Sequence, residues 1–245
     1  MTLTALLSPA LPFFAPGTAG AQTKEPAQKA AEARFEAAVS RFRGIPGRRE
    51  RAIAVHDFVR DTVAFGWSGD FYAEAPFETL SRARGYSVTK TALFVALCRA
   101  VGLGARMRFV DLDARILNGI IDPGTPRVDH AYAEVLLNGW IAVDSFILDR
   151  PFFDAAQAQL QAEGREIGYG TRIGASAEWD GRSGAFAQFG PELSESDFGV
   201  HDDAAAFHGG TSQSWNRRTP ILRLVFPLAV IGANARIEAL RRKVG

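Results

Sequence analysis

Residues 85–106 and 130–144 constrain the fold of this 245-residue chain more than any other part of it. In the first segment, apolar residues recur at helical spacing over 88–101 and the pattern stops at Gly102, which predicts a helix. In the second segment, residues of two kinds alternate along the chain on both sides of Asn138-Gly139, those of one kind apolar, which predicts a β-hairpin. A helix of this kind packed on antiparallel strands, with helical flanks, is an α+β fold.

The length of the hairpin loop decides whether His130 and Asp144 can meet. A two-residue turn would place their side chains on opposite faces of the hairpin. A three-residue loop over 137–139 pairs Leu136 with Trp140 instead, and Asp144 then lies one diagonal step from His130 on the same face. The same register gathers an apolar face for the core, made of Ala131, Ala133, Val135, Ile141 and Val143. We therefore predict the three-residue loop.

Ser87 stands where the predicted helix begins. A nucleophile at a helix N-terminus feels the positive end of the macrodipole, which favours its anionic form. Serine is also among the best N-cap residues, and its position alone favours the cap. A histidine and an aspartate on neighbouring strands favour a site, in which Asp144 would hold the imidazole tautomer and His130 would act as base toward the Ser87 hydroxyl.

Three sequence motifs carry a family resemblance. They are the Gly-x-nucleophile start at Gly85, the Ala-Leu-Cys-Arg-Ala-x-Gly-x-x-Ala-Arg run over 96–106, and the His-Ala-x-x-Glu-Val…Gly-Trp…Asp hairpin over 130–144. Together they resemble the core of the transglutaminase-like superfamily, the papain-related fold of transglutaminases and bacterial cysteine hydrolases. The resemblance covers residues 48–150 and implies a catalytic triad of Ser87, His130 and Asp144.

The chain departs from this family pattern at two places. Ser87 occupies the position of the family's cysteine, and the hairpin is one residue shorter than usual. A thiol titrates near ~8.5 and can pair with histidine as a thiolate. An alkanol titrates far higher, so serine must lose its proton in step with attack. Cys98 is no substitute nucleophile, because a lone cysteine within a helix is usually a buried core residue.

Three functions are consistent with this change. We favour a transglutaminase-like pseudoenzyme, inactive or binding-only, that retains the cleft and binds a protein or peptide. The second is a serine-dependent acyl-transfer enzyme, amidase or peptidase that uses Ser87, His130 and Asp144. The third is the inactivated form of a cysteine hydrolase or transglutaminase.

The predicted organisation has four parts. Residues 1–23 form a leader that is signal-like or disordered, 24–47 an N-terminal helix, 48–150 the transglutaminase-like core, and 151–245 an elaboration packed on the core. The leader has small residues suited to signal cleavage but no basic start, so we favour the cytoplasm over export.

Composition excludes several functional classes. A net charge of +1 gives no reason to expect nucleic acid as a partner. The spacing of His201 and His208 matches no standard metal-ligand set, so we expect a solvated loop there and neither a metal nor a cofactor. The apolar run over 220–234 contains Arg223 and Pro227 and is too short to span a bilayer, so it predicts a packing helix rather than an integral membrane segment. The sequence carries no signal for an oligomeric state.

Overall fold

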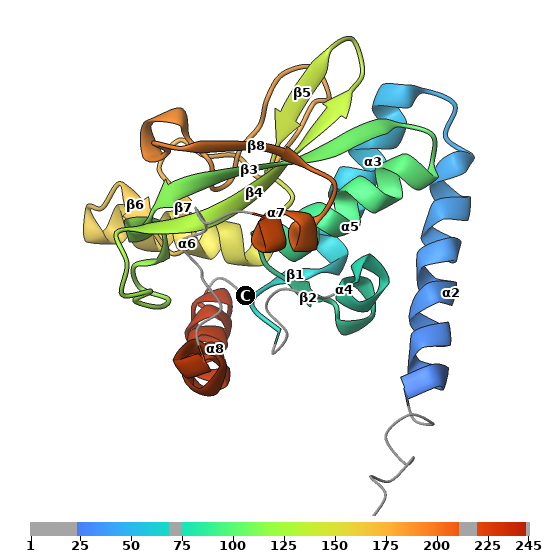
Figure 1. Cartoon of the computed structure of the whole chain (residues 1–245). Helices are drawn as coiled ribbons and strands as arrows, with labels where there is room; N and C mark the ends of the chain where they lie inside the picture. The colour runs from blue at the N-terminus through green and yellow to red at the C-terminus, as the bar shows by residue number, and fades with distance from the viewer. Residues whose placement is uncertain (1–23, 69–74, 211–219, 244–245) are drawn as a thin grey trace, which may run out of the picture.

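The computed structural model describes residues 24–68, 75–210 and 220–243. Its centre is an antiparallel sheet of four strands, whose spatial order β5-β4-β3-β8 differs from their order in the chain (Figure 1). In that order the strands are Trp140–Val143, Arg127–Leu136, Gly104–Asp113 and Asp197–His201. The mixture of helices with an antiparallel sheet confirms the predicted α+β class.

Helix α5, Ser87–Ala100, is the central helix and packs against β3 and β4. The sequence predicts one apolar face for this helix, yet Thr89, Lys90 and Thr91 are buried as well. The reason is that α5 is covered on its other side by helices, chiefly α3 and α4. A helix that is buried nearly all round lies in the core rather than at its edge.

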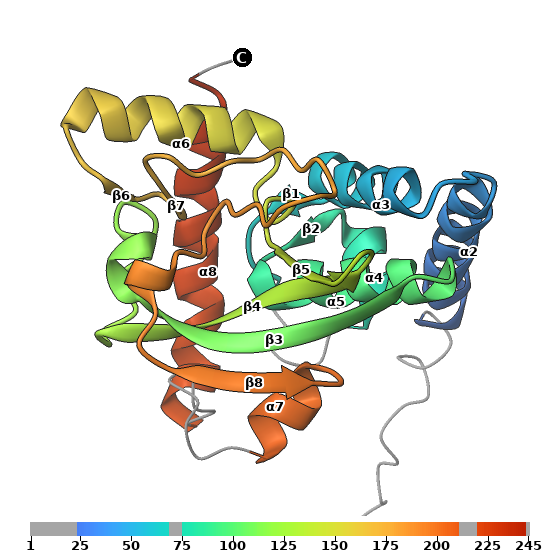
Figure 2. The ribbon, with the colours of Figure 1, turned by 90° about the horizontal axis from the view of Figure 1, so that it is seen from above.

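Three helices, α2, α6 and α8, flank this core at two ends, as Figures 1 and 2 show. At one end lies α2, Lys24–Arg43, which buries Val39 and Phe42 of the predicted stripe. At the other end α6 packs against α8. The other helices are α3 Arg48–Thr62, α4 Pro76–Arg82, α6 Arg150–Glu163, α7 Ala204–Gly210 and α8 Pro220–Arg241, with 3-10 turns at Ala114–Leu117 and Pro191–Leu193.

Two short strand pairs complete the fold. In the parallel pair, β1 (Ala64–Phe65) runs beside β2 (Arg84–Gly85) and leads the chain into α5. The antiparallel pair consists of β6 (Ile167–Gly168) and β7 (Thr171–Arg172). Asp149 joins β1 to α6 and α8. Its carboxylate caps α6 by accepting from the N–H of Phe152. It also accepts from the N–H of Phe65 in β1 and pairs with Arg241 of α8.

The hairpin between β4 and β5 has the predicted register. Leu136 pairs with Trp140 across a three-residue loop, and Ala133 pairs with Val143. Gly139 adopts a φ of 142°, a conformation that favours glycine. The side chains of Ala131, Ala133, Val135 and Val143 are buried together in the main core, as the alternation predicts.

The C-terminal third is more integrated than its Gly- and Ser-rich composition indicates. Strand β8 extends the central sheet by pairing with β3, and its register is interrupted by an irregularity between Phe109 and Val110. Helix α8 buries a stripe that includes Val230, Ala233 and Ile237. None of the helices in the described part of the chain combines the length and the apolar character needed to cross a bilayer.

Candidate functional site

Ser87 is the first residue of α5, and Tyr86 takes the N-cap position. The N-cap interpretation of Ser87 is therefore wrong by one residue. The Thr89 hydroxyl accepts a hydrogen bond from the N–H of Tyr86, and the first backbone bond of the helix runs from the N–H of Lys90 to the carbonyl of Tyr86. The N–H groups before Lys90 have no carbonyl partner within the helix, so the positive helix end faces Ser87.

Gly85 sets the entry of the chain into α5. A Cβ atom at this position would lie 2.7 Å from the Thr89 Oγ1 atom, 2.9 Å from the Lys90 Cγ atom and 2.9 Å from the Thr79 Cγ2 atom. Any larger residue would push the first turn of the helix away from β1, where Phe65 pairs with Gly85. The Gly-x-Ser pattern thus has a steric cause.

His130 and Asp144 form a buried pair at the sheet. The His130 Nε2 atom lies 3.0 Å from the Asp144 Oδ2 atom, and the two side chains are 3% and 0% exposed. Three backbone N–H groups also donate to the Asp144 carboxylate: those of Ala187 at 2.5 Å, Gln188 at 3.3 Å and Phe189 at 2.7 Å. A carboxylate only accepts hydrogen bonds, so it holds His130 as the tautomer with a proton on Nε2. The lone pair is then on Nδ1.

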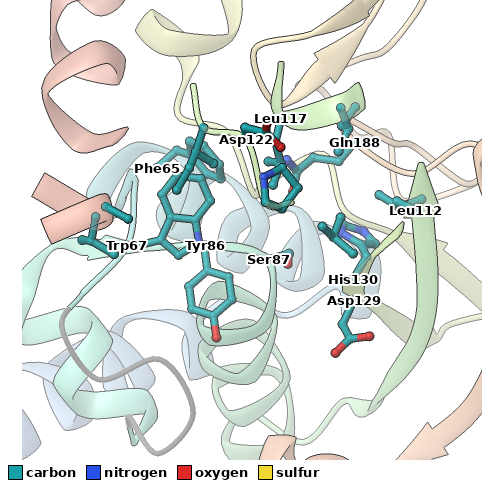
Figure 3. A pocket seen from close by; sticks show the side chains of 16 residues that line it. Phe65, Trp67, Tyr86, Ser87, Leu112, Leu117, Asp122, Asp129, His130 and Gln188 are labelled. Carbon is teal, nitrogen blue, oxygen red and sulfur yellow. The ribbon is translucent and has the colours of Figure 1, made fainter. Parts of the chain in front are cut away.

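Ser87 and His130 line one cavity of about 310 Å³. Figure 3 shows Ser87 at the start of its helix with His130 beside it on the neighbouring strand. The Ser87 hydroxyl makes no hydrogen bond with the His130 ring, although both residues belong to the described part of the chain. The structure therefore brings the three predicted residues into one site but leaves the serine–histidine contact unmade.

Most of the cavity wall is apolar. Aromatic side chains of β1 and the turn after it face Tyr86 on one side, and the aliphatic side chains after β3 form the other. The lining residues are Phe65, Trp67, Tyr86, Ser87, Leu112, Ile116, Leu117, Ile121, Asp122, Pro123, Val128, Asp129, His130, Gln188, Ala229 and Val230.

Lys90 follows Ser87 by one helical turn, a spacing at which a lysine can serve as base to a serine. Here the Nζ atom donates instead to the carbonyl of Val63, and the side chain is fully buried. Burial lowers the pKa of Lys90 to about 7, and the nearby Asp149 opposes that shift. Because its amine is directed at Val63, Lys90 supports the wall of the site rather than the serine.

A second serine, histidine and aspartate lie together away from the cavity. The His56 Nε2 atom is 2.7 Å from the Ser145 Oγ atom, and the His56 Nδ1 atom is 2.9 Å from the Asp57 Oδ1 atom. Ser145 and His56 are fully buried, and His56 packs against Phe146 and Trp179. Burial lowers the pKa of His56, although the hydrogen bond to Asp57 opposes it.

The C-terminal third contributes residues to the site that the sequence does not predict. Residues 187–189 hold Asp144, and Ala229 and Val230 of α8 close one side of the cavity. Backbone donors in an irregular segment leave no periodic signal, so the sequence could not identify them.

The other singled-out residues lie outside the site. Cys98 is fully buried, and burial raises the pKa of its thiol. His201 ends β8 and His208 lies in α7, and their rings lie 5.2 and 4.9 Å from that of Phe207, so the expectation of a solvated loop is wrong for the two histidines. It holds for Asp202 and Asp203, which are exposed in the bend between them. Within residues 24–68, 75–210 and 220–243, no group of three or more His, Cys, Asp or Glu side chains could hold a metal ion.

Comparison with known proteins gives a family match for part of the chain. Residues 36–145 match the model of the transglutaminase-like superfamily, from within α2 to the residue after Asp144. A solved structure described as a "putative cysteine protease" from Cytophaga hutchinsonii is similar at 22% sequence identity and a TM-score of 0.37. The similarity covers 46% of this chain and 36% of that one. No curated protein matches the chain.

Proposed function

We propose that this chain, whose transglutaminase-like domain includes residues 36–145, binds the acyl-bearing segment of a protein or peptide without rapid chemical turnover. One observation carries the proposal: Ser87 and His130 line one cavity, but the hydroxyl of Ser87 has no hydrogen bond to the imidazole. A serine needs a base already aligned with its proton, because its alkoxide is not available near neutral pH.

The site is well suited to hold a carbonyl group. The N–H groups at the start of α5 have no acceptor within the helix, and they lie beside Ser87. Donors of this kind bind a partly negative oxygen, and the helix dipole strengthens the attraction. A bound amide or ester would thus place its carbonyl carbon near Ser87 and its remaining atoms in the cavity.

Serine-dependent acyl transfer is the second candidate, and the intact His130–Asp144 pair favours it. In that reaction His130 would take the Ser87 proton at Nδ1 while the Ser87 Oγ atom attacks the carbonyl carbon. The leaving amine or alcohol would take that proton from His130, and water or an acceptor amine would then release the acyl group from Ser87. Substrate binding would have to bring the hydroxyl and the imidazole into contact.

Labelling with a serine-directed fluorophosphonate separates the two candidates. For the native chain we expect no adduct by intact mass under conditions that label a known serine hydrolase completely. The His130→Ala variant is the matched control. An adduct at Ser87 in the native chain that is absent from the variant would mean that His130 activates the serine, and the binding-only proposal would be rejected.

A further inference from the structure

We infer that the ligand enters this cavity with an uncharged apolar side chain, aromatic or branched, next to its carbonyl group. This inference rests on the proposed function and adds the class of ligand. Eleven of the sixteen lining residues are apolar or aromatic, and they come from four separate parts of the chain. A wall of this kind binds by removing apolar surface from water.

The two sides of the cavity are complementary in shape to such a side chain. The rings of Phe65 and Trp67 lie edge to face with their centroids 5.5 Å apart, and the ring centroids of Trp67 and Tyr86 are 6.5 Å apart. These three residues are nearly buried in the unliganded chain, so the aromatic side is already ordered. Leu112 and Ile116 on the opposite side are almost fully buried and equally fixed. A preformed apolar cavity loses little side-chain entropy on binding.

A carboxamide side chain would have to compete with bonds that polar lining groups already make. The Asp122 carboxylate accepts from the N–H of Gly124, and the His130 ring bonds to Asp144. The amide nitrogen of Gln188 already donates to the carbonyl of Gly170 at 2.8 Å. Transfer of an unpaired carboxamide from water into such an environment is unfavourable. The glutamine side chain of a peptide would therefore bind less well than phenylalanine or leucine.

The charge of the lining disfavours anionic ligands. Asp122 and Asp129 are part of the lining, and no lysine or arginine is among the described residues that form it. A ligand carboxylate or phosphate would be repelled by these carboxylates and would lack a cation to pair with. The carboxylates thus disfavour an anionic side chain, and the apolar wall disfavours a charge of either sign, because transfer of a charged group out of water is unfavourable.

Helix α8 provides a way to block the cavity without touching the core. Ala229 is exposed and lines the cavity, whereas its neighbour Leu228 is 74% exposed and does not. Replacement of Ala229 by phenylalanine places a large ring over the ligand position. The same replacement at Leu228 adds a ring of equal size to the same helix outside the cavity, which makes it the matched control.

The test is equilibrium binding of three capped amino acids by ligand-observed NMR: N-acetyl-phenylalaninamide, N-acetyl-glutaminamide and the anionic N-acetyl-glutamate amide. We expect the phenylalanine compound to bind the native chain at least about tenfold more tightly than either of the others, because only its side chain removes a large apolar surface from water against this wall. Ala229→Phe should remove this binding, and Leu228→Phe should leave it unchanged.

The outcomes separate this inference from the proposed function. Equal or tighter binding of the glutamine compound, still blocked by Ala229→Phe, would overturn the inference and leave a ligand-binding cavity. If none of the compounds bound, or if Ala229→Phe had no effect on their binding, both the inference and the proposed function would be rejected. Circular dichroism of the two variants verifies that each one folds.

Discussion

The described part of the chain contains two arrangements of serine, histidine and aspartate that differ in hydrogen bonding and in access to the cavity. At Ser145, His56 and Asp57 the two hydrogen bonds of a triad are present, at 2.7 and 2.9 Å, but the serine and the histidine are fully buried. At Ser87 only the histidine–aspartate bond is present, at 3.0 Å, but serine and histidine face a cavity of about 310 Å³.

The difference shows that hydrogen-bond geometry alone does not identify a reactive site. Access, a helix N-terminus and an oriented base must coincide, and they coincide only around Ser87. Ser145 is nevertheless not independent of the site, because it follows Asp144 directly in the chain. Its bond to His56 fixes the backbone from which the Asp144 carboxylate extends. We interpret the Ser145 arrangement as support for the Ser87 arrangement, which lines the cavity.

The largest expected effect comes from replacing each serine with cysteine. The thiol introduced by Ser87→Cys would lie at a helix N-terminus beside His130, two features that lower a thiol pKa. At pH 6 we expect iodoacetamide to alkylate it roughly a hundredfold faster than in the Ser87→Cys/His130→Ala double variant. Ser145→Cys should remain unmodified while the protein is folded, because that position is fully buried.

Intact mass as a function of time measures both rates. Cys98 serves as an internal reference in every variant, since its buried thiol should not react in the folded chain. Equal rates at positions 87 and 145, or a rate at position 87 that is independent of His130, would contradict the distinction between the two arrangements.

Replacement of Asp144 and of Asp57 by asparagine should lower the stability of the protein by different amounts, an effect smaller than that on alkylation. Asp144→Asn places an amide group against some of the three backbone N–H donors of 187–189, so at least one buried donor loses its acceptor. We expect the free energy of unfolding to fall by about 3 kcal/mol. Asp57 has a side chain that is 42% exposed, and Asp57→Asn should change the free energy by less than about 1 kcal/mol.

Urea unfolding of the two variants at neutral pH gives the comparison directly. The substitution is chemically the same at both positions, so the difference between the two losses reports the surroundings of each carboxylate. Similar losses in both variants would mean that residues 187–189 do not hold Asp144 as described.

The sequence predicted those parts of the site that depend on periodicity. The alternation around Asn138-Gly139 was enough to choose the hairpin register, because only one loop length places the apolar residues on one face. The register then brings His130 to Asp144. Gly85 and Ser87 were recognisable through the family resemblance, and the structure adds a steric reason for the glycine.

Other parts depend on contacts between distant segments and leave no local pattern. The N–H groups of 187–189 act through the backbone, so any residues there could serve. The position of α8 over the cavity follows from its packing on α6, and the apolar run over 220–234 predicts a packing helix without indicating its partner. His56 and Ser145 are 89 residues apart, and nothing in the spacing connects them.

The smallest expected effect is a dependence of stability on pH that arises from His56. Burial lowers the pKa of His56 below its ordinary value of 6.5, so below that pH the unfolded chain binds more protons than the folded one. The contribution of neutral His56 to stability is complete above pH 6.5 and is lost as the pH falls, by at most about 1.4 kcal/mol per pH unit. Asp57 does not add to this change near neutral pH, because its hydrogen bond with His56 lowers its own pKa.

His56→Gln removes this titration and retains a side chain that can bond to Ser145. We expect the native chain to be the more stable of the two at pH 7.5 and the gap in free energy of unfolding to narrow steadily toward pH 5. Urea unfolding at five pH values measures that gap, and taking the difference cancels the titration of groups that the two chains share. A gap that stayed constant from pH 7.5 to 5 would show that His56 accepts a proton in the folded chain as readily as in the unfolded one. Since lining the cavity is what separates His130 from His56 in this comparison, such a result would require that water reaches the Ser145 arrangement too.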